Sequence, residues 1–295
     1  MNHQDYDVVI PAYNAAATVR RALDSVLAQA QPPRAVVVVD DGSSDETAAI
    51  VESYGAPVRL IRQANAGPGA ARNRGARETS SPWIALLDAD DEWLPGKMKA
   101  QMALTSDPKV GVVCCPSQGF HPPFPEPCDL AALWRRNPLS LSSAVVRRTA
   151  FESVEGFSSD RLLDPVADYD LWLRIVSGGW RFVQVSKPLL RYHTTPGNLS
   201  SQTARFAASE LALVDRLGLS LGMDPANVAA KRQEILDTYG REALFFRNMP
   251  TARALLSRAL IARPSAWRVA WFMLSFAPVG LLDLRRRAKA RSSTN

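Results

Sequence analysis

The chain has 295 residues, of which 46% are hydrophobic and 22% are charged. This composition is ordinary for a globular protein and excludes bulk disorder and collagen-like repeats, while the length corresponds to roughly two domains. Cys114, Cys115 and Cys128 are too few for a disulfide framework, which indicates reduced thiols in a cytosolic compartment. The first residues contain no basic segment followed by an apolar one, so a secretory signal is not expected.

The positive charge of the chain lies in its last third. Residues 206–295 contain 14 Lys or Arg against 7 Asp or Glu, whereas residues 1–205 contain 21 against 22. Basic and apolar residues occur together in this region, which fits an anionic membrane surface better than nucleic acid. No nucleic-acid-binding motif is recognisable, so we expect no nucleic-acid partner.

The first hundred residues predict an α/β domain. Four short apolar runs without alternation read as strands that are buried on both faces of a parallel sheet, at residues 8–10, 36–39, 58–61 and 84–87. Between the first two runs, Val19, Leu23, Val26 and Leu27 predict the apolar face of a helix. Residues 43–46 (SSDE) resemble a capping box for a second helix. Strand and helix therefore alternate, as in βαβ units.

Polar residues follow three of these predicted strands, at residues 11–14, 40–43 and 88–91. Each group alone is explained by a turn or a helix cap, but parallel strands bring their carboxyl ends to one edge of the sheet, where ligands bind. Asp88 and Asp90 flank a small residue and can hold a hard divalent cation, although a solvated acidic turn remains an alternative. The glycine-rich start of a basic helix at residues 67–75 places Arg72 where it could meet a phosphate.

A family becomes recognisable from these segments taken in order. They are VVIPAYNAAATVRRALDSVLAQ, VVVVDDGSSDET, NAGPGAARNRGA, LLDADDEWLPGKM, SSAVVRRTAFESVEGF and DYDLWLRI. In this order the chain resembles family 2 glycosyltransferases over roughly residues 5–200. The resemblance implies the GT-A nucleotide-diphospho-sugar transferase fold, a mainly parallel sheet flanked by helices. It also implies inverting transfer of a sugar from a nucleotide-sugar donor to an acceptor hydroxyl, with Mg²⁺ or Mn²⁺.

The same resemblance implies roles for individual residues. It places Pro11, Tyr13 and Asp41 in the nucleoside pocket, with Asp40 supporting the turn, Arg72 near the nucleotide, Asp88 at the ribose or sugar and Asp90 on the metal.

Asp168 occupies the position of the family's catalytic base, but Ala167 stands where the family has a preceding Glu. Helix capping is the alternative role for Asp168, and we expect it rather for Asp170, in a helix over residues 168–177. His193 either completes the metal shell or is a structural hydrogen-bonding group.

The last third is predicted to be helical, so the expected domains are residues 1–205 and 206–295. Helices are expected over residues 206–217, 224–246 and 251–262. An apolar segment at residues 269–282 is too short to span a bilayer. Because Trp267, Trp271 and Phe272 and five cations at residues 285–291 accompany it, we expect an amphipathic, basic, membrane-proximal end. A core helix of a small bundle with a solvated tail is the alternative.

Together these features predict a cytoplasmic enzyme attached peripherally to the inner face of the cell membrane. It would use a nucleotide-sugar, with UDP as the expected nucleotide, and an unidentified glycan or lipid-linked acceptor in polysaccharide or glycoconjugate synthesis. A nucleotidyltransferase, which would also use acidic strand ends and a metal, remains open. So does a non-catalytic module that binds sugar-nucleotides or lipids.

Overall fold

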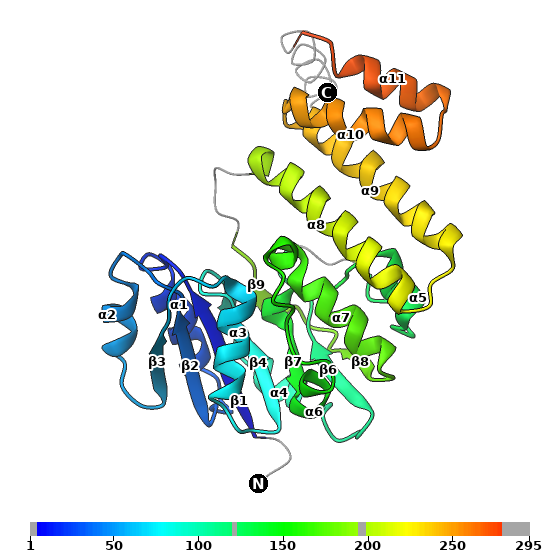
Figure 1. The fold of residues 1–295 in the computed structure, drawn as a ribbon. Helices are drawn as coiled ribbons and strands as arrows, with labels where there is room; N and C mark the ends of the chain where they lie inside the picture. The colour runs from blue at the N-terminus through cyan, green and yellow to red at the C-terminus, as the bar shows by residue number, and fades with distance from the viewer. Residues whose placement is uncertain (1–4, 120–122, 194–198, 279–295) are drawn as a thin grey trace, which may run out of the picture. The chain divides into compact units, whose positions relative to one another are not determined.

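The computed structural model describes residues 5–119, 123–193 and 199–278 (Figure 1). The chain divides into two compact units, Met1–Thr194 and Thr195–Asn295. The boundary that the sequence suggested at residue 205 falls inside the helix α8 (Leu199–Ser220), because that helix begins earlier than its apolar pattern does.

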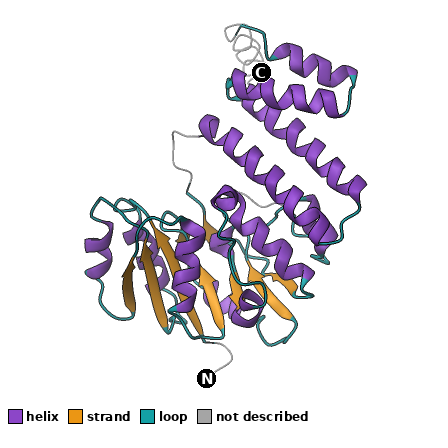
Figure 2. Ribbon diagram, in the orientation of Figure 1, coloured by secondary structure: helices purple, strands orange, loops and turns teal. Residues whose placement is uncertain are grey.

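A mixed sheet forms the centre of the first unit. Among the described residues its strand order is β3-β2-β1-β4-β7-β6-β8 (Figure 2). The strands are β1 (Tyr6–Ala12), β2 (Ala35–Asp40), β3 (Val58–Arg62), β4 (Trp83–Leu86), β6 (Val110–Cys114), β7 (Val145–Arg147) and β8 (Arg181–Gln184).

The first four of these strands are parallel and lie side by side. Their carboxyl ends therefore share one edge of the sheet. β1, β2 and β4 are buried on both faces, as their continuous apolar runs predict. The expectation was wrong for β3, because it is the edge strand of the sheet and Arg59 and Arg62 are exposed.

The other half of the sheet changes direction. β7 pairs antiparallel with both β4 and β6, while β8 runs parallel to β6. A second, two-stranded sheet joins β5 (Glu92–Trp93) to β9 (Leu190–Arg191) in antiparallel register. This small sheet holds the end of the first unit against the residues that follow Asp91.

Helices cover both faces of the large sheet. They are α1 (Val19–Leu27), α2 (Thr47–Glu52), α3 (Pro68–Arg77), α4 (Lys97–Met102), α5 (Leu130–Arg135), α6 (Arg148–Glu152) and α7 (Ala167–Ser177), with 3-10 turns η1 (Leu141–Ser143) and η2 (Arg161–Val166). Residues of α1 and α4 share the main core with Ile10, whereas α3 packs against Val37 and Val39 on the opposite face. A Cβ atom on Gly75 of α3 would lie 2.4 Å from Val9 Cγ1, so only glycine allows this close approach.

Two local expectations were wrong. Leu27, placed on the apolar face of α1, is 38% exposed because it lies in the last turn of the helix. The capping box is also absent: α2 begins at Thr47, and Asp45 Oδ1 accepts its backbone N–H at 3.0 Å. The shorter Asp side chain reaches that N–H from two residues upstream, as in an Asx turn.

The second unit is helical in its described part. It contains α8, α9 (Pro225–Phe245), α10 (Met249–Ala262) and α11 (Ala266–Leu274). Asp224 accepts the Ala226 N–H at 2.7 Å before Pro225, which confirms the predicted start of α9. The apolar segment expected to form one helix is interrupted, because α11 ends at Leu274, and residues 279–282 lie outside the described residues. Among the described helices none is long and apolar enough to cross a membrane.

Candidate active site

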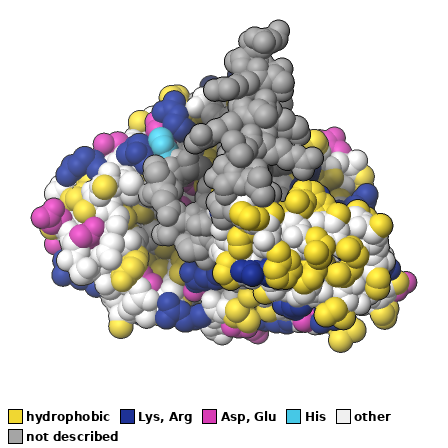
Figure 3. Space-filling view, turned by 90° about the horizontal axis from the view of Figure 1, so that it is seen from above, with side chains coloured by type: hydrophobic (Ala, Val, Ile, Leu, Met, Phe, Trp, Pro, Cys, Tyr) yellow, Lys and Arg dark blue, Asp and Glu magenta, His cyan; other side chains and the backbone are white. Residues whose placement is uncertain are grey.

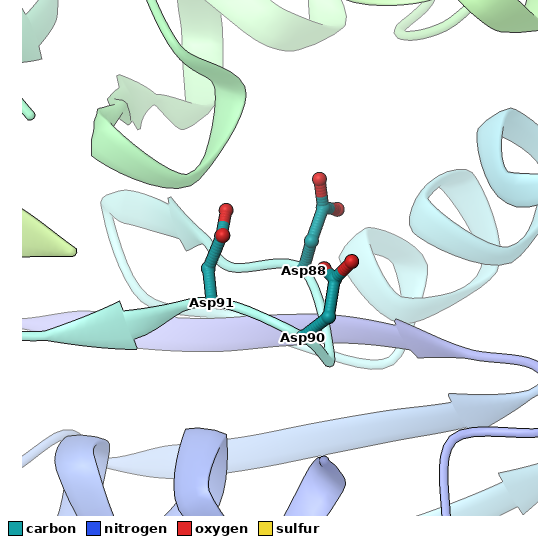
Figure 4. Close-up of side chains that lie close together, drawn as sticks. All are labelled: Asp88, Asp90 and Asp91. Carbon is teal, nitrogen blue, oxygen red and sulfur yellow. The ribbon is translucent and has the colours of Figure 1, made fainter. Parts of the chain in front are cut away.

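Three carboxylates gather where β4 ends. Asp88, Asp90 and Asp91 occupy the turn between β4 and β5, and one ligand atom from each lies within 4.8 Å of the others (Figure 4). The Asp91 N–H donates to the Asp88 carbonyl at 3.1 Å, which tightens the turn. The sequence predicted Asp88 and Asp90 as the functional pair, and the structure adds Asp91 to them.

The electrostatics of this turn favour a cation. Burial, followed by the charge of Asp88, raises the pKa of Asp90 above its usual range, and burial raises the pKa of Asp91 to about 7. Asp91 Oδ2 is buried and has no hydrogen-bond partner among the described residues. Carboxylate oxygens are the ligands that Mg²⁺ and Mn²⁺ prefer. The three side chains therefore fit a divalent ion, which would supply the missing partner.

Groups outside the turn hold its backbone in place. The Ser142 hydroxyl accepts the Asp88 N–H at 3.1 Å, and Arg21 of α1 donates to the Asp90 carbonyl at 2.6 Å. The indole of Trp93 in turn donates to the Ser142 carbonyl at 2.9 Å. Sequence reasoning missed Arg21 and Ser142, because neither belongs to an acidic or glycine-rich pattern; their segments are far from Asp88 along the chain.

Arg72 connects the acidic turn to α3. Its guanidinium lies 2.5 Å from Asp88 Oδ1, and its side chain is only 8% exposed. The guanidinium also lies over the Phe157 ring, at 5.4 Å from the ring centroid. The structure therefore brings Arg72 and Asp88 together, as expected if both face the same ligand, and fixes the orientation of Arg72 from two sides.

Asp168 faces the same region from α7. Its Oδ2 accepts a hydrogen bond from Asn137 Nδ2 at 3.0 Å. Burial raises the pKa of Asp168, and the Asn137 hydrogen bond and the charge of Arg72 oppose this rise. Asp168 is not the N-cap of α7, a position that Val166 holds without a side-chain bond. A partly desolvated carboxylate that accepts an oriented hydrogen bond is suited to take up a proton.

Asp170, two residues further on, has a different environment. Its side chain is fully buried and accepts hydrogen bonds from Arg174 Nε at 2.9 Å and Nη2 at 2.5 Å. The helix-capping role expected for it is therefore wrong, because its carboxylate serves an ion pair within α7. Of the two acids of this segment, Asp168 therefore faces the candidate site, whereas Asp170 stabilises α7.

The turn after β2 is organised by its two aspartates. Asp40 Oδ1 accepts the Ser43 N–H at 3.0 Å, which matches the supporting role expected of it. Asp41 is buried and accepts hydrogen bonds from the Ala66 N–H at 2.9 Å and the Gly67 N–H at 2.8 Å. The N-terminus of α3 is therefore tied to Asp41.

Two further residues predicted for the nucleoside pocket follow from β1. Pro11 is buried within the strand, whereas Tyr13 lies just beyond it and is 56% exposed. Asn14 connects this end to the β2 turn, since its Oδ1 accepts the Ser44 N–H at 2.9 Å. The structure thus brings the ends of β1 and β2 together, with Tyr13 open to solvent.

His193 lies beside the acidic turn, but its ring is directed to a different partner. Its backbone N–H donates to Asp91 Oδ1 at 3.1 Å, and its ring Nε2 lies 3.3 Å from Glu92 Oε2. The carboxylates that cluster in the described part of the chain do not include the His193 ring in their group. Its metal-binding role stays a prediction.

Tyr192, next to His193, is a further residue close to the acidic turn. Its side chain is 55% exposed. Burial of part of the ring raises the pKa of its phenol, and a set of four nearby carboxylates raises it further: Asp91, Asp90, Asp88 and Asp168. Tyr192 therefore lies within electrostatic range of both the acidic turn and the candidate base.

Comparison with known proteins identifies related chains. Residues 7–126 match the family described as Glycosyl transferase family 2. The succinoglycan biosynthesis protein ExoO of Rhizobium meliloti is 46% identical over 97 residues, which cover 32% of this chain and 28% of that protein. The chain spans about a third of the length of the first curated relatives that it matches.

Solved structures share the fold of the chain. Staphylococcus aureus TarS 1–349 in complex with UDP-GlcNAc has a TM-score of 0.65 and 19% identity, over 88% of this chain and 82% of that one. The mannosyltransferase PcManGT from Pyrobaculum calidifontis, in complex with GDP-Man and Mn²⁺, has a TM-score of 0.63 and 22% identity, over 90% and 77%. These likenesses confirm the expected GT-A fold.

Proposed function

We propose that this protein is a family 2 glycosyltransferase, which transfers a sugar from a nucleotide-diphosphate donor to an acceptor hydroxyl with inversion; residues 7–126 match that family. One observation carries the proposal. Arg72 pairs with Asp88 of the acidic turn while its charge also acts on Asp168, so a candidate metal site and a candidate base lie on one side of the sheet. The proposed reaction needs both a metal ion, at the departing diphosphate, and a base, at the acceptor hydroxyl.

The donor is proposed to be a nucleotide-sugar, with UDP as the expected nucleotide. Structural relatives are recorded with UDP-GlcNAc and with GDP-Man. We propose that Pro11, Tyr13 and Asp41 line the nucleoside pocket while Asp40 holds the turn. Arg72 and Asp88 would then meet the diphosphate and the ribose or sugar.

Asp90 and Asp91 are proposed to hold a Mg²⁺ or Mn²⁺ ion, with Asp88 beside them and His193 as a further candidate. A bound divalent ion would stabilise the negative charge of the departing nucleoside diphosphate. Because that charge is then met by the ion, the protein needs no general acid at the leaving group.

Asp168 is proposed as the general base. In an inverting displacement the acceptor oxygen bonds to the anomeric carbon while the bond from that carbon to the diphosphate breaks. The acceptor proton passes to the Asp168 carboxylate, which Asn137 orients through its hydrogen bond to Oδ2. The raised pKa of Asp168 makes it a better proton acceptor than an ordinary aspartate.

The biological setting is proposed to be polysaccharide or glycoconjugate synthesis at the cytoplasmic face of the cell membrane. A relative is named for succinoglycan biosynthesis, and the basic, partly apolar C-terminal region supports membrane association. The acceptor would be a glycan or a lipid-linked glycan.

A donor panel tests this function. The full chain is incubated with individual nucleotide-sugars and Mn²⁺, and thermal shift identifies the donor; a ligand at 100 times its dissociation constant adds about 2.7 kcal/mol of stability. Release of free nucleoside diphosphate is then measured, with and without candidate acceptors. Pyrophosphate instead of nucleoside diphosphate would indicate a nucleotidyltransferase, and binding without turnover would indicate a non-catalytic module.

Asp90→Ala provides the matched test of the metal site. It should abolish Mn²⁺-dependent donor binding without unfolding the chain, because it removes one ligand and no core contact. Asp215→Ala, which removes an acid from the second unit, should bind donor as the wild type does. Equal Mn²⁺ dependence in Asp90→Ala and wild type would contradict the assignment.

A further inference from the structure

The helix α11 turns its charged side chain toward the protein and exposes apolar side chains. Its sequence, AWRVAWFML, contains one charged residue, and that residue is turned inward: Arg268 lies 2.7 Å from Asp237, and the two side chains are only 13% and 9% exposed. One side of the helix, with Trp271 and Phe272, packs on Leu244 and Leu256. A surface helix of a globular protein normally directs its charged residues to solvent.

The outer side of α11 is apolar. Val269, Met273 and Phe276 follow one another at the spacing of a helix face and are 46%, 61% and 55% exposed. Trp267 is 42% exposed, and the guanidinium of Arg268 lies 4.7 Å from its ring centroid. We call Val269, Met273 and Phe276, the last of them just beyond the end of α11, the α11 surface. Figure 3, which views the molecule from above, shows hydrophobic side chains gathered over part of the helical unit.

The charge around the α11 surface is mainly positive, although Glu242 lines a pocket with Trp271 and Leu274 of α11. From residue 243 to residue 278 the sequence contains five arginines and no Asp or Glu. Arg253, Arg258 and Arg263 are exposed, and Arg253 lies 5.3 Å from the centroid of the Phe276 ring. Lys and Arg side chains border the hydrophobic area in Figure 3. An exposed apolar surface with a predominantly basic margin is complementary to anionic lipid headgroups over an acyl layer.

We propose that the α11 surface inserts into the interface of an anionic lipid bilayer, with the arginines at its margin among the headgroups. The proposal rests on the membrane association proposed above and assigns it to folded residues rather than to the basic tail alone. A second copy of the chain fits poorly, because the same surface would mainly place arginine against arginine. A bilayer needs only shallow insertion, about 5–10 Å, which a helix of this length provides.

Vesicle sedimentation with the full chain tests the proposal. The wild type should bind vesicles of phosphatidylcholine with about 30% phosphatidylglycerol and bind pure phosphatidylcholine much less. Met273→Glu should weaken binding to the anionic vesicles at least about tenfold, since it places a charge at the centre of the apolar contact. Leu219→Glu is the matched control: Leu219 is 74% exposed on α8, so the same charge is added at an exposed leucine outside the surface.

Leu219→Glu should bind the anionic vesicles as the wild type does. Met273→Leu, which keeps an apolar side chain at this position, should also retain wild-type binding. Wild-type binding with Met273→Glu unchanged would overturn the α11 surface while leaving membrane association by the tail intact. Absence of wild-type binding would overturn both. Wild-type dimerisation in the absence of lipid, abolished by Met273→Glu, would overturn the α11 surface as a bilayer contact and assign it to a second copy of the chain. Donor hydrolysis measured on the same samples separates these outcomes from the proposed transfer reaction, because Met273 lies in the other unit.

Discussion

Asp168→Asn is the substitution that separates catalysis from structure in this protein. Asparagine keeps the size of the side chain and can still accept the Tyr169 N–H, which lies 2.7 Å from Asp168 Oδ1. It cannot take up a proton at neutral pH. If Asp168 is the general base, kcat should fall by about 10²–10⁴-fold. The dissociation constant of the donor should hardly change, because other residues are proposed to hold it.

The stability of this variant has a predictable pH dependence. Burial raises the pKa of Asp168 in the folded chain, so the stability it contributes is fully present below about pH 4, the unfolded value, and is lost as the pH rises through the folded pKa. Asparagine never ionises. Its single oxygen can accept only one of the two hydrogen bonds that Tyr169 N–H and Asn137 Nδ2 donate to Asp168. The Tm of Asp168→Asn relative to the wild type should therefore be highest at neutral pH and should fall as the pH is lowered.

The assay measures release of nucleoside diphosphate at saturating donor and acceptor across a pH series. The wild type should lose activity in acid as Asp168 becomes protonated, at a pH above the usual aspartate range, and the variant should show no such limb. Equal kcat values for the two proteins would refute the assignment. Asp170→Asn is the internal control, because it weakens the buried ion pair with Arg174. The free energy of unfolding should fall by about 1.5–3 kcal/mol, with a lower Tm. The kcat per folded molecule should be retained.

Three further predictions concern the acidic turn, Arg72 and the C-terminal tail. Burial raises the pKa of Asp91 to about 7, so the stability it contributes is present below about pH 4 and lost as the pH rises through 7. The metal-free wild type should therefore melt lower at about pH 8 than at about pH 6, and Asp91→Asn should reduce that difference in differential scanning calorimetry. Arg72→Lys keeps the charge but loses the planar contact with Asp88 and Phe157, so kcat/KM in the donor assay should fall about tenfold; an unchanged value would mean that only the charge matters. Removal of residues 284–295, which lie outside the described residues, should reduce sedimentation with anionic vesicles while activity on a soluble acceptor persists; undiminished sedimentation would exclude an electrostatic role for the tail.

The sequence predicted the parallel half of the sheet well, because β1, β2 and β4 are buried on both faces and need continuous apolar runs. It could not predict β7, whose three residues carry too little pattern and whose direction is set by its pairing with β4 and β6. The antiparallel strand is a property of the tertiary structure.

For the candidate site, the acids were predictable and their supports were not. Asp88, Asp90 and Asp168 stand in motifs that indicate their chemistry. Ser142 and Asn137 contribute single hydrogen bonds across long stretches of chain, so no local pattern marks them. The pairing of Asp170 with Arg174, at i and i+4 of one helix, was visible in the sequence, but its complete burial was not.

If Asp41 lines the nucleoside pocket, as proposed, its existing hydrogen bonds limit which nucleobase it can bind. A carboxylate has about four acceptor sites, and three are taken: Oδ1 accepts from Gln63 Nε2 and the Ala66 N–H, and Oδ2 accepts from the Gly67 N–H. A base that reaches Asp41 therefore finds one free lone pair, on Oδ2. The uracil of a uridine nucleotide has one ring N–H, at N3, which matches one acceptor. Guanine presents adjacent N1–H and amino donors, so one of them would be left without a partner. Selectivity for uridine over guanosine nucleotides would then follow from lone pairs already occupied by the protein's own backbone and by Gln63.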